Sequence, residues 1–200
     1  MVGRTDRCSV ILEGMAFSYK LTRPGRRQVL NLHLAGDLPD LQGLRISNID
    51  IGVVAANWCR VGYVPHVALN DLCSRRPGLM DALWRETLLD AAIGSEWLSN
   101  LGRRGALARL SHLLCEVVVR HRSAGLTSDY SCSFPLTQTA LADALGLSTV
   151  HINRALQKLR HERLMELKDR RLTVLDWDRL CEIAEFDPAY LYLERHPPIS

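Results

Sequence analysis

Residues 136–160 read LTQTALADALGLSTVHINRALQKLR, a pattern that predicts two short helices joined at a glycine. Thr137 and Ser148 can each cap the start of a helix, and Gly146 supplies the backbone freedom needed just past the end of the first helix. One face of the second helix is apolar at helical spacing and is therefore expected to be buried; it comprises Ile152, Ala155, Leu156 and Leu159. The opposite face is polar and basic, as in a helix-turn-helix that reads DNA; it comprises Thr149, Val150, Asn153, Arg154, Gln157 and Lys158.

An ordinary amphipathic helix pair is the alternative interpretation, because every surface helix has a charged outer face. Three features favour the helix-turn-helix. Small Ala142 lies beside Leu141 and Leu145, where two helices would cross closely, and Gly146 lies at the turn. The outer face of the second helix is also rich in Asn, Arg and Thr rather than in Glu and Lys.

Positive charge is concentrated around this segment. Residues 148–171 hold seven Lys or Arg against three acids, whereas residues 176–200 hold six acids and two arginines. The whole chain of 200 residues has a formal net charge of only +3, with 47% hydrophobic and 24% charged residues, as in an ordinary globular protein. A local positive surface is what binding to DNA phosphates requires.

The cysteines are scattered, without a CxxC pair or the His/Cys spacing of a zinc site. We expect reduced thiols and no metal or other cofactor, with Cys59, Cys115 and Cys181 as small residues of apolar segments. No stretch approaches the roughly 18 apolar residues of a membrane span, and the amino terminus lacks the apolar region of a signal peptide. The sequence therefore predicts a cytoplasmic protein without a membrane partner.

Residues 8–34 and 49–65 are expected to form short strands, because their apolar residues run together or alternate between turn signals such as RPGR. They predict part of a small antiparallel barrel or sandwich, with about five strands, which is few for a closed barrel. After residue 160, residues 164–176 predict a two-stranded hairpin, or wing, that turns at 168–171. Its cations can contact the DNA backbone or serve solubility, and both interpretations stay open for Lys168, Arg170 and Arg171.

Helical periodicity begins at residue 67. A short helix ends at the Arg75-Arg76-Pro77-Gly78 break, and residues 79–101 predict a long helix with an apolar face. That face can pack against the chain's own strands or form a two-helix dimer seam, which we favour. The residues expected at the dimer interface are Met80, Leu83, Trp84, Leu88 and Ala91. Further helices are expected over 103–122 and 176–186, and the polar residues 123–135 are expected to form a linker.

This order of parts resembles the Crp/Fnr superfamily of bacterial transcription regulators. The resemblance is close where the chain reads LGRRGALARLSHLLCE, LTQTALADALGLSTVHINRALQKLR and LTVLDWDRL, and it is weaker over ILEGMAFSYKLTRPGRRQVLNLHLAGD. It implies an α+β fold with a partial cyclic-nucleotide-binding-like β-barrel (1–76), a dimerisation helix (77–101), a winged helix-turn-helix domain (102–187) and a tail (188–200). It further implies a homodimer on a pseudo-palindromic site in double-stranded DNA, with a recognition helix (148–160) in each major groove.

Individual roles also follow from the resemblance. It places Thr149, Val150, Asn153 and Arg154 at base edges, where Arg154 could donate two hydrogen bonds to guanine and Val150 could touch a thymine methyl. Many members have Glu in place of Val150, so the preferred half-site should differ from theirs. The residues expected at phosphates are Thr137, Gln138, Thr139, His151 and Lys158.

Three departures concern sensing. By the resemblance, the chain begins inside the barrel. Residues 38–50 lack the Gly-Glu and Arg-Ser or Arg-Thr pairs that hold a cyclic nucleotide, and Arg45 near Ser47 is the nearest equivalent. Cys8 alone cannot replace the cysteine cluster of oxygen-sensing members. The resemblance thus leaves any small-molecule effector unassigned.

The leading hypothesis is a dimeric, DNA-binding transcription regulator, for which RNA polymerase is a further partner to consider. The alternative is a truncated interaction partner that heterodimerises with a full-length relative and modulates it. A cyclic-nucleotide sensor is disfavoured by the missing phosphate-binding loop. An enzyme is the least favoured class, because the histidines are scattered and no nucleophile or acid has motif spacing with them.

Overall fold

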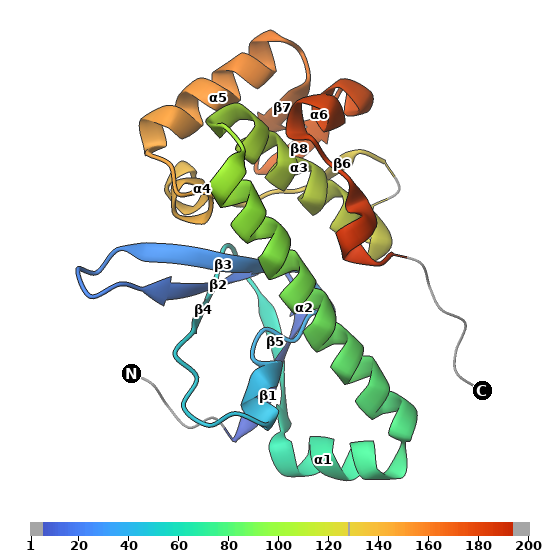
Figure 1. Ribbon diagram of the computed structural model, residues 1–200. Helices are drawn as coiled ribbons and strands as arrows, with labels where there is room; N and C mark the ends of the chain where they lie inside the picture. The colour runs from blue at the N-terminus through green and yellow to red at the C-terminus, as the bar shows by residue number, and fades with distance from the viewer. Residues whose placement is uncertain (1–5, 128, 194–200) are drawn as a thin grey trace.

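The computed structural model describes residues 6–127 and 129–193, and its fold mixes helix and sheet. A long helix, α2 (Pro77–Arg103), runs along most of the molecule, between the strands at one end and the remaining large helices at the other (Figure 1). It begins two residues earlier than its apolar pattern predicts, because proline is compatible with the first position of a helix. None of the helices in the described ranges combines the length and the apolar character needed to cross a bilayer.

The amino-terminal strands form two small antiparallel sheets that do not close into a barrel. In one, β1 (Arg7–Glu13) pairs with β5 (Arg60–Pro65). In the other, β2 (Ala16–Leu21) lies between β3 (Arg27–His33) and β4 (Gly52–Ala55). All five strands match the segments predicted from alternation and turn signals. The 3-10 turn η1 (Leu41–Leu44) and helix α1 (His66–Arg75) complete this part of the chain.

The carboxy-terminal part is a winged helix-turn-helix. Helix α3 (Ala106–Ser123) is its central element, and α4 (Gln138–Leu145) and α5 (Thr149–His161) pack on it. A three-stranded sheet has the order β6-β8-β7, from β6 (Ser131–Ser133), β8 (Arg171–Val174) and β7 (Met165–Lys168). The last described elements are α6 (Trp177–Ala184) and the 3-10 turn η2 (Pro188–Leu191).

Strand β6 corrects one prediction. Residues 123–135 were expected to be only a polar linker, but within them Ser131–Ser133 pairs antiparallel with β8. Cys132 is buried there, with 2% of its surface exposed, and Ser131 Oγ lies 3.0 Å from Thr173 Oγ1 across the sheet. Three residues are too few to produce a visible alternation between polar neighbours, so the sequence carried no strand signal.

One large apolar core connects both parts of the chain. It contains side chains of α3, α4 and α5 together with Phe17, Val29 and Leu32 from the β2–β3 hairpin and Met15 just before it. A second, smaller cluster lies between β1, η1, α1 and α2 and comprises Cys8, Leu41, Leu69, Cys73 and Leu83. The hairpin is therefore packed into the core of the winged helix-turn-helix, whereas β1 and β5 lie over the small cluster.

Candidate DNA-binding surface

The helix-turn-helix has the local geometry that its sequence predicts. Thr137 Oγ1 accepts a hydrogen bond from the backbone N–H of Ala140 at 3.1 Å, and Ser148 Oγ accepts one from that of His151 at 3.3 Å. Gly146 ends α4 in the left-handed conformation, with φ 60°. A side chain at that position would be strained, so glycine suits the turn. These features fix where α5 begins.

Burial divides α5 into two faces. Ile152, Ala155, Leu156 and Leu159 are buried, as the apolar spacing predicts. The four residues expected at base edges are all exposed on the other face, namely Thr149, Val150, Asn153 and Arg154. Val150 keeps 56% of its surface exposed although it is apolar. Among the described residues, no carboxylate lies within ion-pair distance of Arg154, so its guanidinium can bind an external partner.

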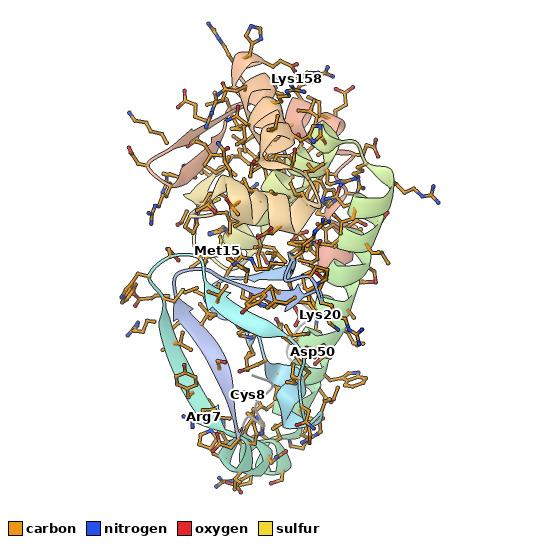
Figure 2. The ribbon with its side chains drawn as sticks, turned by 90° about the vertical axis from the view of Figure 1, so that its left-hand side faces the viewer. Arg7, Cys8, Met15, Lys20, Asp50 and Lys158 are labelled. Carbon is orange, nitrogen blue, oxygen red and sulfur yellow. The ribbon has the colours of Figure 1, made fainter. Side chains whose placement is uncertain are left out.

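The residues expected at phosphates surround that face. Thr137, Gln138 and Thr139 are exposed at the start of α4, and His151 and Lys158 are exposed on α5. Lys158 Nζ lies 3.8 Å from Glu162 Oε1, a loose pair at the surface. Figure 2 shows Lys158 at the end of the molecule that lies away from Cys8 on β1, Lys20 on β2 and Met15 just before β2. The polar surface is therefore terminal and unobstructed by the strands.

The predicted wing is a two-residue hairpin, because Lys168 pairs with Arg171 and the turn holds Asp169 and Arg170, both at positive φ. Its three cations are exposed. Arg171 Nε donates to Ser131 Oγ at 2.7 Å, which ties this guanidinium to β6. The structure gives the side chains of Lys168 and Arg170 no such partner among the described residues.

Arg109 on α3 holds the turn in place, a role that the sequence analysis did not identify. Its guanidinium donates to three backbone carbonyl oxygens: Leu145 at the end of α4 (2.7 Å), Leu101 near the end of α2 (2.8 Å) and Arg104 (3.0 Å). Charged hydrogen bonds to helix-end carbonyls are favourable because these oxygens lack partners within the helix. One side chain thus connects the long helix to the first helix of the helix-turn-helix.

The β2–β3 hairpin contacts α4 from the other side. Arg27 Nη2 lies 2.8 Å from Asp143 Oδ2, and Gln28 Nε2 donates to the carbonyl oxygen of Ala144 at 3.2 Å. In Figure 1 the hairpin extends along the side of α4 that lies away from α5. The strand part is therefore coupled directly to the helix that precedes α5 in the helix-turn-helix.

A buried polar network also connects the strand part to α2 and to the winged helix-turn-helix. Glu116 on α3 is fully buried and accepts hydrogen bonds from Trp97 Nε1 at 2.9 Å and from Tyr190 Oη at 2.8 Å. Burial raises the pKa of Glu116, an effect opposed by nearby Arg120. Arg120 Nη2 also lies 2.9 Å from Asp37 Oδ2, so residues of the strand part, α2, α3 and η2 share one network.

Two carboxyls of α2 lie beside that network. Burial raises the pKa of Asp90 to about 6, against the opposing effect of Arg120, and it also raises the pKa of Glu86. Both line a half-open cavity of about 1090 Å³ between α2, α3 and η2. Asp90 Oδ1 accepts a hydrogen bond from Asn31 Nδ2 at 2.9 Å, which ties α2 to β3. The described residues contain no group of three or more His, Cys, Asp or Glu side chains that could hold a metal ion.

The expected dimer interface divides into two groups. Trp84, Leu88 and Ala91 are exposed on α2, with 65% and 52% of the first two exposed. Leu83 is only 8% exposed and belongs to the small cluster, against which Met80 also packs. Leu83 and Met80 therefore face the chain's own strand part, a correction of their predicted place, because adjacent apolar residues on one helix point to different sides.

Comparison with known proteins relates these features to a known family. Residues 108–183 match the Crp-like helix-turn-helix domain. The chain is 25% identical over 174 residues to the fumarate and nitrate reduction regulatory protein of Vibrio cholerae, an alignment that covers 87% of this chain and 69% of that protein. Residues 108–183 therefore form a Crp-like helix-turn-helix domain, and the chain as a whole is similar to transcription regulators of the Crp/Fnr superfamily.

Other Crp/Fnr comparisons cover most of the chain. A probable transcriptional activator of Rhizobium leguminosarum bv. viciae is 27% identical over 173 residues, which are 86% of this chain and 71% of that protein. The solved structure of FixK2 from Bradyrhizobium japonicum superimposes with a TM-score of 0.78 at 24% identity and covers 89% of this chain and 87% of that one. The α+β fold with a cyclic-nucleotide-binding-like strand part is thereby confirmed, although its sheets are open.

Proposed function

We propose that this chain is a Crp/Fnr-type regulator that binds a pseudo-palindromic DNA site as a homodimer, with α5 of each subunit in a major groove. The observation that carries the proposal is α5 itself. A capped helix with a fully buried apolar stripe presents an exposed face of Thr, Asn and Arg, in which Arg154 has no acidic partner among the described residues. A face used only for solubility has no need of these residue types, which can contact base edges.

Each exposed group has a role in the proposal. Arg154 donates two hydrogen bonds to guanine, Asn153 and Thr149 contact neighbouring base edges, and Val150 packs against a thymine methyl. Thr137, Gln138, Thr139, His151 and Lys158 bind phosphates and set the register of α5 on the duplex. Lys168 and Arg170 of the wing turn reach the flanking DNA backbone. Arg171 on β8 holds the wing in place through its hydrogen bond to Ser131 on β6.

The dimer seam is the exposed stripe of α2. Beyond Trp84, Leu88 and Ala91 it continues through exposed Ser95 and Leu98. The successive spacings are four, three, four and three residues, which is the repeat of a two-stranded coiled coil. Small Ala91 and Ser95 allow the two helices to approach closely at the centre. The proposed seam therefore replaces Met80 and Leu83 with Ser95 and Leu98.

Selection from random duplex DNA by the purified chain tests the proposal. The expected result is a two-fold symmetric motif whose half-sites lie about one helical turn apart, near 10 base pairs from centre to centre. A motif without symmetry would contradict the homodimer. No enrichment by folded protein would favour the alternative, a partner that heterodimerises with a relative through the same α2 stripe.

A further inference from the structure

Two cysteines of the winged helix-turn-helix lie next to each other. Cys115 Sγ on α3 and Cys181 Sγ on α6 are 4.0 Å apart although the residues are 66 positions apart in sequence. All six cysteines are free thiols, and the other four have no second thiol as a hydrogen-bond partner in the part of the chain that the structure describes. The contact is therefore specific to this pair.

The two thiols differ in access and in acidity. Cys115 is 0% exposed, whereas Cys181 is partly exposed on the surface helix α6. Either sulfur can donate in the hydrogen bond between them. This bond lowers the pKa of Cys181, against the opposing effects of burial and of Asp178, and it raises the pKa of Cys115, so Cys115 donates when Cys181 is ionised. Cys181 is thus the thiol that an oxidant can reach and the one more readily present as the reactive thiolate.

We propose that Cys181 and Cys115 form a site of reversible oxidation by hydrogen peroxide, which converts the pair into a disulfide. The Cys181 thiolate attacks one peroxide oxygen, the O–O bond breaks, and the other oxygen leaves as water after taking up a proton. Cys181 is then a sulfenic acid. The Cys115 sulfur attacks the Cys181 sulfur, the S–O bond breaks, and the sulfenic oxygen leaves as water with the Cys115 proton. A dithiol reductant reverses the bond by thiol–disulfide exchange.

The position of this pair gives the disulfide a structural consequence. A disulfide has an S–S length near 2.05 Å, so the two sulfurs must approach by about 2 Å, which α6 can supply by moving toward α3. The loop that the bond closes contains β6, α4, α5 and the wing. Oxidation would therefore link the two ends of the segment that carries every proposed DNA contact, and it would restrict the unfolded chain.

Peptide mapping of the intact chain tests the proposal directly. Reduced protein is treated with stoichiometric hydrogen peroxide, remaining thiols are alkylated, and non-reduced digests are analysed by mass spectrometry. We expect a Cys115–Cys181 crosslinked peptide that has lost two hydrogen atoms, formed between two cysteines of the same chain and removed by dithiothreitol. The oxidised protein should also unfold at a higher temperature than the reduced protein.

Three variants separate the steps. Cys115→Ala should leave a sulfenic acid on Cys181 that dimedone labels, and Cys181→Ala should abolish both crosslink and label. Cys59→Ser is the matched control and should crosslink like the parent, because Cys59 lies elsewhere and donates to the carbonyl oxygen of Met15. Full alkylation of Cys115 and Cys181 after peroxide, or a crosslink to any other cysteine, would overturn the proposal. None of these measurements depends on DNA binding.

Discussion

The two parts of this chain stabilise themselves in different ways. In the winged helix-turn-helix, α3 buries most of its length, from Leu110 to Val119, against α4, α5 and the small sheet. In the strand part, β4 leaves Val53 and Val54 exposed, and the local cluster around β1 has only five buried residues. The β2–β3 hairpin instead packs into the core of the other part. The carboxy-terminal part thus supplies most of the large core, whereas the strand part adds its hairpin to that core and otherwise has only the small cluster.

This difference bears on how such a regulator can be controlled. The hairpin, the Arg27–Asp143 pair and the network around Arg120 all join the strand part to elements that position α5. A change in the strand part that moved the hairpin would therefore act on α4 directly. Substitutions in each part and at their contacts can measure how unequal the two parts are and how tightly they are joined.

The largest effect is expected from a core substitution. Leu114 is 0% exposed, so Leu114→Ala should lower the free energy of unfolding by about 2–5 kcal/mol through lost burial and a cavity. Val53→Ala, at an exposed position of β4, should cost about 0.5 kcal/mol or less. Urea unfolding of both variants provides the measurement. Comparable losses would contradict the contrast between the two parts.

The α2 helix gives the second comparison, because its two faces should respond differently. Leu88→Asp should weaken the proposed dimer by about 3 kcal/mol or more, since each dimer would lose two leucines from its seam and bring two charges together. Leu83→Ala should instead lower stability and leave the dimer intact. Analytical ultracentrifugation and urea unfolding distinguish the two variants. An unchanged mass for folded Leu88→Asp would place the dimer interface elsewhere.

The third prediction concerns pH and the joint between α2 and β3. The pKa of Asp90 is about 6 in the native protein, above the ordinary value of 3.8, so the native state holds this proton more tightly than the unfolded state does. The stability that protonated Asp90 contributes is complete below about pH 4 and is lost as the pH rises through about 6. The amide of Asp90→Asn does not titrate, so the variant does not lose this stability as the pH rises. Its amide oxygen can still accept the hydrogen bond from Asn31.

The stability of Asp90→Asn relative to the parent should therefore rise by about 2 kcal/mol between acidic and neutral pH. Denaturant unfolding of both proteins at about pH 4.5 and about pH 7.5 gives this difference. The buried histidines His33 and His112, whose pKa values burial lowers, are present in both proteins and cancel in the comparison. A pH-independent difference would show that Asp90 titrates normally.

The smallest effect is expected at the hairpin. A double-mutant cycle on Arg27 and Asp143 should give a coupling of about 0.5–1 kcal/mol, because both side chains are partly shielded from solvent. The Lys20–Asp50 pair, at 3.0 Å but well exposed, is the matched control and should couple more weakly (Figure 2). Equal couplings would indicate that the hairpin contact with α4 is a surface contact only.

The sequence predicted features whose causes are local. Caps at Thr137 and Ser148, the glycine at the turn and the apolar stripe of α5 lie within a few residues of one another, so they were recognisable and were confirmed. The two faces of α2 could not be separated, because Leu83 and Trp84 are adjacent and both apolar. The Arg27–Asp143 pair joins residues 116 positions apart, and Arg109 binds backbone oxygens, so neither leaves a sequence pattern.

The central claim is that α5 reads base sequence, and the affinity of Arg154→Ala for selected and random duplexes tests it most directly. We predict a loss of about 1–3 kcal/mol on the selected site and little change on random DNA. Lys158→Ala should weaken both equally and reduce the salt dependence, whereas Arg75→Ala, at the far end on α1, should change neither. Equal losses on both duplexes for Arg154→Ala would contradict base recognition by α5.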